Sequence, residues 1–186
     1  IKKFNLERTK RVSKYNTNSK IYKSAFNFFK ISSKNKYTYN FDWLGMPIIQ
    51  YPEDIITIQE IIYRTQPNVI IETGIARGGS LILHSSLLHM IQKNSHVIGI
   101  DVDIRKHNRK KIERHFFYKN ISMVEGDSTS EKTITEVKKI LKKLKFSKKI
   151  MVCLDSKHTH DHVLNELKQY SKFVSKNCYI VVFDTT

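Results

Sequence analysis

The chain has 186 residues, which is long enough for one domain with a substantial hydrophobic core. Its 33 Lys and Arg residues outnumber its 17 Asp and Glu residues, and the net charge of +16 favours anionic partners such as nucleic acid, a membrane surface or an acidic glycan. No apolar run approaches the roughly 20 residues of a membrane span, and we see no signal peptide. The two cysteines, Cys153 and Cys178, lie in apolar runs and form no disulfide framework. We therefore expect a reducing, cytoplasmic setting.

Residues 1–40 form a basic N-terminal extension. They contain eleven Lys or Arg residues and a single acid, Glu7. Only the stretch Ile21–Lys30 has the spacing of a short amphipathic helix, and we expect the rest of this region to be partly flexible. The charge indicates contact with an anionic surface, although such runs are often merely solvated. No nucleic-acid-binding motif accompanies it, so we do not expect a nucleic-acid partner.

Residues 41–186 have the pattern of an α/β domain. The stretch Phe41–Pro52 is apolar and interrupted by Gly and Pro, which predicts a packed loop, and a helix is expected over Glu53–Thr65. Strands and helices then alternate, which predicts a doubly wound, mostly parallel, Rossmann-like sheet. The expected strands are Asn68–Thr73, His96–Asp101, Ile121–Glu125, Lys149–Leu154 and Cys178–Phe183. The expected helices are Ser80–Lys93, Arg105–Phe117, Glu131–Leu144 and Asp161–Phe173.

An acidic residue stands at or just after the end of every expected strand. In a parallel sheet of this kind, ligands bind outside the carboxyl ends of the strands. Acidic residues at all five ends therefore predict one shared ligand site. The acids are Glu72, Asp101, Glu125 with Asp127, Asp155, and Asp184.

The glycine-rich turn after the first of these strands indicates the ligand. Its glycines, Gly74, Gly78 and Gly79, have neither the G-x-G-x-x-G spacing of a nicotinamide site nor the Gly-Lys-Ser/Thr of a P-loop. Glu72 suits a cationic group such as the ammonium of an amino acid, and Asp101 is placed to bind ribose hydroxyls. Asp127 and Ser128 would frame an adenine. Together these features predict S-adenosylmethionine, with Ser80 also capping the helix start.

The stretch Val152–Val163, VCLDSKHTHDHV, has the groups for proton transfer. We expect Asp155 and His158 to be catalytic, and Asp155 with Asp184 to share a Mg²⁺ that lowers the pKa of a substrate hydroxyl. A cap at a turn is the competing interpretation for Asp184. The histidines at alternate positions suggest zinc only if they share a face, and we interpret His160 and His162 as surface residues.

Beyond residue 39 the chain resembles the cephalosporin hydroxylase family, which includes rhamnosyl O-methyltransferases. The matching stretches are FDWLGMPIIQYPEDI, IIETGIARGGSLI, VIGIDVDIR, VEGDST, LDSKHTHDHVLNEL and YIVVFDT. The resemblance implies a class I S-adenosylmethionine-dependent O-methyltransferase, typically with Mg²⁺, that acts on a sugar hydroxyl of a glycan or glycoside. Within the resemblance, the cofactor turn corresponds to Glu72, Thr73, Gly74, Gly78, Gly79 and Ser80, the ribose acid to Asp101, the adenine side to Asp127 and Ser128, and the catalytic and metal loop to Asp155 and His158.

The chain departs from the family pattern in two places. Lys157 stands where members often have Asp, which changes the charge of the metal loop. The fold normally continues for two more strands, so we expect the sheet to lack its last strands. Two alternatives stay open: a non-catalytic binding module with a basic arm, and a nucleic-acid methyltransferase. A homo-oligomer also stays open.

Overall fold

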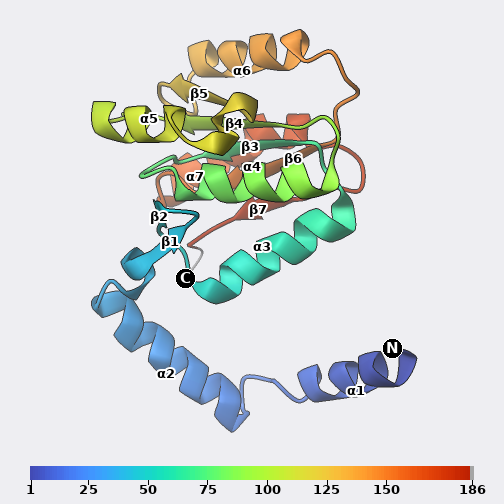
Figure 1. The fold of residues 1–186 in the computed structure, drawn as a ribbon. Helices are drawn as coiled ribbons and strands as arrows, with labels where there is room; N and C mark the ends of the chain where they lie inside the picture. Colours follow the sequence, from blue (N-terminus) through green and yellow to red (C-terminus); the bar gives the residue numbers. More distant parts are fainter. Residues whose placement is uncertain (185–186) are drawn as a thin grey trace. The chain divides into compact units, whose positions relative to one another are not determined.

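The computed structural model describes residues 1–184 (Figure 1). It divides into two compact units, Ile1–Asn40 and Phe41–Thr186. In the described part of the chain, no helix is both long enough and apolar enough to cross a bilayer.

The first unit contains more helix than the sequence pattern indicates. Helix α1 spans Lys2–Val12 and α2 spans Lys20–Lys34, and a 3₁₀ turn follows at Tyr37–Asn40. The helix expected at Ile21–Lys30 is thus present but longer, with the Ser19 hydroxyl accepting a hydrogen bond from the backbone N–H of Tyr22 as its N-cap. Helix α1 is a correction: its apolar residues lack helical periodicity, so pattern analysis does not detect it.

The second unit opens with a hairpin where a packed loop was expected. Strand β1, Phe41–Trp43, pairs antiparallel with β2, Met46–Ile48. Gly45 lies at the turn with φ +80°, where glycine is favoured. The loop prediction was wrong because each strand has only three residues, too few to show alternation. Helix α3, Pro52–Thr65, follows as expected.

The central sheet confirms the predicted α/β class. Its order is β5-β4-β3-β6-β7 and every pair is parallel. The chain runs outward from β3 first on one side and then on the other, so the strand order reverses beside β3 and creates the crevice where such sheets bind ligands. The strands are β3 Val69–Thr73, β4 His96–Asp101, β5 Ile121–Glu125, β6 Ile150–Leu154 and β7 Ile180–Val182.

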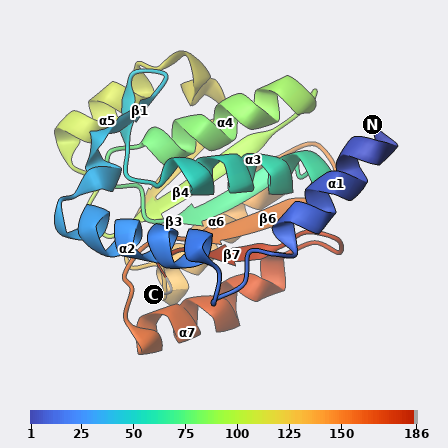
Figure 2. The same cartoon turned by 90° about the horizontal axis from the view of Figure 1, so that it is seen from below.

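Helices cover both faces of this sheet (Figures 1 and 2). One apolar cluster joins the sheet to α3, α4 and α5, and the other joins it to α6 and α7. The remaining bounds are α4 Gly79–Ile91, α5 Lys106–Glu113, α6 Glu131–Lys143 and α7 His160–Tyr170. The helices expected to reach Phe117 and Phe173 end earlier and continue as 3₁₀ turns, Phe116–Asn120 and Ser171–Phe173.

Successive residues of each strand alternate between the two clusters. Ile70 and Cys153 pack toward α3 and α4, whereas Ile71 and Val152 pack toward α6 and α7. Both faces are therefore apolar, which explains why the strands are continuous hydrophobic runs in the sequence. Cys153 is a buried free thiol, as its apolar run predicts.

Candidate active site

The loops at the carboxyl ends of the strands line one pocket of about 430 Å³. That volume lies within the roughly 300–1,000 Å³ typical of small-molecule sites. The pocket is lined by Gly74, Ala76, Asp101, Val102, Asp127, Ser128, Asp155, Ser156, Lys157 and His162. Loops following four different strands thus converge where the acidic strand ends predict a ligand.

The glycines of the turn after β3 are required by close packing. Gly74 has φ +92°, and a Cβ there would overlap the carbonyl oxygen of Asp155. A Cβ on Gly79 would overlap the backbone of β2 at Pro47, and one on Gly78 would meet the Ile112 side chain of α5. Gly74 alone of the three lines the pocket. The turn therefore lies against its neighbours with no room for side chains.

The carboxylate of Asp101 organises this turn. Its Oδ2 accepts hydrogen bonds from the backbone N–H groups of Ile75 (2.8 Å) and Ala76 (3.0 Å), and its Oδ1 accepts one from Asp103 (3.1 Å). The side chain of Asn108 in α5 donates to the Ala76 carbonyl. Asp101 thus lines the pocket, as predicted, and also fixes the shape of the glycine turn.

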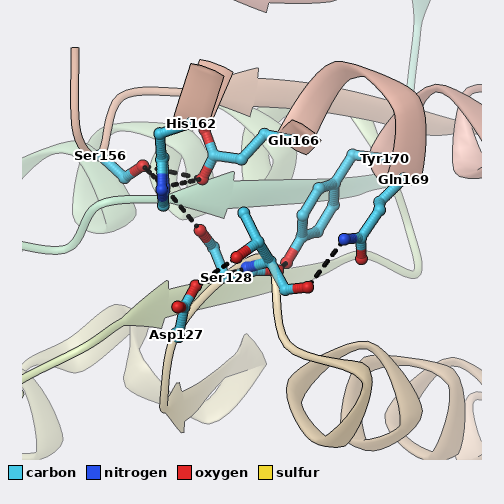
Figure 3. A network of polar contacts seen from close by, with 8 residues as sticks. Asp127, Ser128, Ser156, His162, Glu166, Gln169 and Tyr170 are labelled. Atoms are coloured by element: carbon cyan, nitrogen blue, oxygen red, sulfur yellow. Dashed lines mark hydrogen bonds and ion pairs between the residues drawn. The ribbon is translucent and has the colours of Figure 1, made fainter. Parts of the chain in front are cut away.

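A network of polar side chains joins the loops after β5 and β6 (Figure 3). The Nε2 atom of His162 lies 3.1 Å from the Ser128 hydroxyl, 3.2 Å from the Ser156 hydroxyl and 3.3 Å from the Glu166 carboxylate. Ser156 donates to Glu166 (2.7 Å), and the Tyr170 hydroxyl donates to the Ser128 carbonyl (2.8 Å). The network fixes the pocket wall formed by residues after β5.

The position of His162 corrects the sequence interpretation. It was expected on the surface, but its side chain is only 19% exposed and lines the pocket. Its partner Glu166, one helical turn later in α7, is 1% exposed. The i, i+4 spacing of this His–Glu pair was the available signal, since such residues face the same side of a helix. His160, by contrast, is exposed as expected and contacts Asp161.

Asp127 is placed differently from the rest of that wall. It is exposed, and its Oδ1 accepts hydrogen bonds from both the backbone N–H and the hydroxyl of Thr129. These bonds lower the pKa of the Asp127 carboxyl. Asp127 therefore stays ionised at the pocket edge, with Oδ2 available to a ligand.

Asp155 stands at the centre of the site, at the end of β6. The Gln50 side chain donates to its Oδ2 (2.7 Å), which leaves Oδ1 on the side of His158, 4.0 Å from Nε2. Burial, with the negative charges of Glu72 and Asp184, raises its pKa to about 8. An ionised Asp155 therefore requires a compensating positive charge. Gln50, a partner from the segment before α3, was missed by sequence reasoning because a lone Gln in an apolar stretch carries no spacing signal.

Three potential ligand atoms meet at this point. Asp155, His158 and Asp184 present ligand atoms within 4.8 Å of one another, and His158 Nε2 lies 3.4 Å from Asp184 Oδ2. Asp184 follows β7 with φ +51°, a conformation that Asp tolerates better than most residues. This arrangement brings together the three residues that the sequence assigned to catalysis and metal binding.

The remaining predicted residues lie behind the glycine turn. Glu72 is 1% exposed and one carboxylate oxygen lies 3.5 Å from His84 Nδ1 of α4. Neither of these two atoms has a hydrogen-bond partner, and the same holds for the buried Thr73 hydroxyl. Glu72 and Ser80 line a separate small space of about 10 Å³ with Gln50 and Asp54. His84 was missed because it lies within an apolar helix and has no motif around it.

Comparison with known proteins connects this geometry to a family. Residues 35–186 match the family model described as "Rhamnosyl O-methyltransferase/CmcI". Rhamnosyl O-methyltransferase of Mycobacterium leprae is 25% identical over 143 residues, which make up 77% of this chain and 59% of that protein. The Mycobacterium tuberculosis (strain H37Rv) protein of the same name is 27% identical over 144 residues, 77% of this chain and 56% of that one. The chain thus spans less than two thirds of these relatives.

Solved structures show the same fold. The structure "cmcI-D160 Mg-SAM" superposes with a TM-score of 0.57 at 20% identity, covering 79% of this chain and 58% of that one. The apo structure of CalS11, a TDP-rhamnose 3′-O-methyltransferase, also gives 0.57 at 17% identity, covering 97% and 77%. From the family match over residues 35–186, the chain belongs to the rhamnosyl O-methyltransferase/CmcI family.

Proposed function

We propose that this protein is an S-adenosylmethionine-dependent O-methyltransferase that acts on a sugar hydroxyl with the help of Mg²⁺. The observation that carries the proposal is the convergence of a pocket lined by Gly74, Asp101 and Ser128 with the group Asp155, His158 and Asp184 at one sheet edge. The names of the relatives, which are rhamnosyl O-methyltransferases, support the reaction type.

The pocket is suited to the nucleoside of the cofactor. Asp101, already fixed by the turn amides, has lone pairs left to accept ribose hydroxyls. Ser128 and His162 form the opposite wall, where the adenine would lie. Glu72 and Ser80, whose carboxylate and hydroxyl suit an ammonium group, lie behind the turn at Gly74, and the small separate space that they line would have to widen to admit that group. The buried Glu72 oxygen that lacks a hydrogen-bond partner supports this assignment.

The metal-capable group fits Mg²⁺ by its donor chemistry. Mg²⁺ prefers oxygen ligands and keeps several waters, which two carboxylates and a substrate oxygen satisfy. We assign Asp155 and Asp184 as ligands. The raised pKa of Asp155 supports a cation here, because a buried carboxylate among other acids is stable in its ionised form only beside positive charge. Histidine nitrogen is a poorer Mg²⁺ ligand, which leaves His158 for proton transfer.

When bound, the cofactor supplies an electrophilic methyl group and Mg²⁺ supplies positive charge beside the acceptor oxygen. His158 would accept the proton of the acceptor hydroxyl during that transfer. Because His158 Nε2 faces the carboxylates of Asp184 (3.4 Å) and Asp155 (4.0 Å), Nδ1 is the nitrogen left to accept the proton. Asp155 and Gln50 fix the geometry of attack, so catalysis depends chiefly on positioning and charge.

Replacing Asp155 by Ala tests this function most directly. We expect loss of Mg²⁺-dependent methyl transfer to a rhamnoside by at least 100-fold, with S-adenosylmethionine binding within a few fold of wild type, because Asp155 acts at the acceptor end. His160→Ala, on an exposed side chain of the next helix, is the matched control. Unchanged methyl transfer in Asp155→Ala would remove its assigned role. Detectable cofactor binding without transfer to any hydroxyl in wild type would favour the binding-module alternative.

The basic unit supplies a second contact, with an anionic bilayer surface. Lys20, Lys23, Lys30 and Lys34 share one side of α2 by their spacing, and its apolar residues lie mainly on the opposite side. Ile21, Tyr22, Phe26 and Phe28 each expose more than two fifths of their surface. A helix with a lysine face and an aromatic face is typical of one that lies in a membrane interface.

Vesicle co-sedimentation tests this contact independently of methyl transfer. We expect binding to vesicles with 30% anionic phospholipid, little binding to zwitterionic vesicles, and weakening as salt rises. Changing the four α2 lysines to Gln should abolish it, whereas changing them to Arg should preserve it. Equal binding to both vesicle types would contradict the proposal. Salt-sensitive RNA binding instead would favour the nucleic-acid alternative.

A further inference from the structure

The network in Figure 3 determines which way the Ser128 hydroxyl donates its hydrogen bond. The Nε2 atom of His162 is surrounded by three oxygen atoms, from Ser128, Ser156 and Glu166, at 3.1–3.3 Å. The side chain of Glu166 is buried and is an acceptor when ionised. A bare nitrogen lone pair facing that carboxylate would be repelled.

The hydrogen bond made by Ser156 indicates whether His162 Nε2 carries a proton. Its hydroxyl donates to Glu166 Oε1 at 2.7 Å, so only its oxygen lone pairs are left to face His162. Nε2 therefore meets a carboxylate oxygen and a hydroxyl oxygen that both act as acceptors. Only an Nε2 that carries a proton satisfies this arrangement. The same N–H lies 3.1 Å from the Ser128 oxygen, so the Ser128 hydroxyl cannot donate its proton to Nε2.

The proton on His162 leaves the Ser128 hydroxyl available as a hydrogen-bond donor. Since a protonated Nε2 offers no lone pair, the Ser128 proton is free to be donated elsewhere, and Ser128 lines the pocket. Its backbone is held as well, because the buried Tyr170 donates to its carbonyl at 2.8 Å. Both the side-chain oxygen and the main chain of Ser128 are thus held in place, and its O–H is available to an acceptor in the pocket.

We propose that His162, kept in its Nε2-protonated form by Glu166 and Ser156, is a positioning residue that makes Ser128 an obligate hydrogen-bond donor to a ring nitrogen of the cofactor's adenine. This inference rests on the proposed function, in which the pocket holds a nucleoside. Under this proposal, the Ser128 hydroxyl selects the base, and His162 of α7 makes that hydroxyl a donor. A base with C–H in place of that nitrogen would leave the Ser128 proton without an acceptor.

The tautomer is measured without any ligand. In protein labelled with ¹⁵N-histidine, long-range ¹H–¹⁵N correlation spectra distinguish a protonated from an unprotonated Nε2. The His162 signals are identified by their loss in His162→Gln. We expect a protonated Nε2 in the free protein. An Nδ1-protonated neutral ring at His162 would overturn the inference whatever the protein binds.

Calorimetry with S-adenosylhomocysteine and its 1-deaza, 3-deaza and 7-deaza analogues tests selectivity. We expect wild type to bind one analogue about 3- to 10-fold more weakly, the range for one neutral hydrogen bond. Ser128→Ala and His162→Leu should erase that difference, and His162→Gln, which retains an N–H donor, should restore it. The control is His160→Leu, which should behave as wild type.

The outcomes separate the two proposals. If wild type binds none of the four compounds, the proposed cofactor is wrong. If wild type binds S-adenosylhomocysteine and all three analogues with equal affinity, the role given to Ser128 and His162 is wrong while the proposed function stands. The same holds if His162→Leu weakens the binding of every ligand by one common factor. Thermal unfolding of each variant, followed by circular dichroism, establishes that the variants compared are folded.

Discussion

Replacing Asp155 by Asn should make the metal-free protein more stable. The folded state raises the pKa of this carboxyl from 3.8 to about 8, so folding disfavours its ionised form. Below about pH 4 the side chain is protonated in both states and costs nothing. As pH rises from about 4 to 8, the unfolded chain releases the proton while the folded protein retains it, and stability falls.

The size of the stability difference follows from the pKa shift of Asp155. Each pKa unit corresponds to about 1.4 kcal/mol, so at pH 7 the wild type is less stable by about 4 kcal/mol than a protein with a neutral side chain at this site. Asn has nearly the same shape and still accepts the hydrogen bond that Gln50 donates. Relaxation and residual structure in the unfolded state absorb part of the gain. We therefore expect about 2–4 kcal/mol, or a rise in Tm of roughly 5–15 °C.

Thermal unfolding of both proteins at pH 5, 7 and 8.5, with chelator present, measures this effect. The stability difference should be about 1–2 kcal/mol at pH 5, grow to pH 8 and then level off. Adding Mg²⁺ should raise the Tm of the wild type and leave that of Asp155→Asn unchanged, since only the wild type can bind the ion through this carboxylate. A variant that is less stable at pH 7, or a difference independent of pH, would refute the reasoning.

Three further predictions concern neighbouring features of the site. Gly74→Ala should lower the free energy of unfolding by more than about 3 kcal/mol and abolish cofactor binding, because the added Cβ would overlap the Asp155 carbonyl. The control is Gly45→Ala, which has open space around it and should cost only about 1–2 kcal/mol in a denaturant titration. Glu72→Gln removes a negative charge that raises the pKa of Asp155, so the midpoint pH for Mg²⁺-induced stabilisation should fall; an unchanged midpoint would contradict the electrostatic account. His158→Gln should lower kcat for methyl transfer by about 10²- to 10⁴-fold with an unchanged Kd for S-adenosylmethionine, and a full kcat would exclude it as the base.

The fold was predictable from sequence where its physical signal is strong. Strands buried on both faces appear as continuous apolar runs, so the bounds of β3 and β6 were predicted to within one residue. The β1–β2 hairpin was missed because three-residue strands show no period. Helix α1 was missed because it buries none of its residues and so needs no apolar stripe.

The site was predictable where a residue's place follows from the end of a strand. Asp101, Asp155 and Asp184 are brought to one edge by topology alone. Gln50 and His162 come from other elements, and their orientation depends on packing between α3, α7 and the sheet, which no local pattern reports. Gly78 and Gly79 were predicted to bind the ligand. In the structure, the absence of a side chain at these two positions leaves room for Ile112 and for the β1–β2 hairpin.

The central claim is that the pocket at the carboxyl ends of the strands binds S-adenosylmethionine. Isothermal titration of the full chain with this compound tests it most directly, with Asp101→Ala as the pocket variant and Asp103→Ala, whose side chain is exposed, as the matched control. We predict one binding site in wild type and Asp103→Ala, and at least tenfold weaker binding in Asp101→Ala. Absence of binding by wild-type protein with a cooperative unfolding transition would contradict the account.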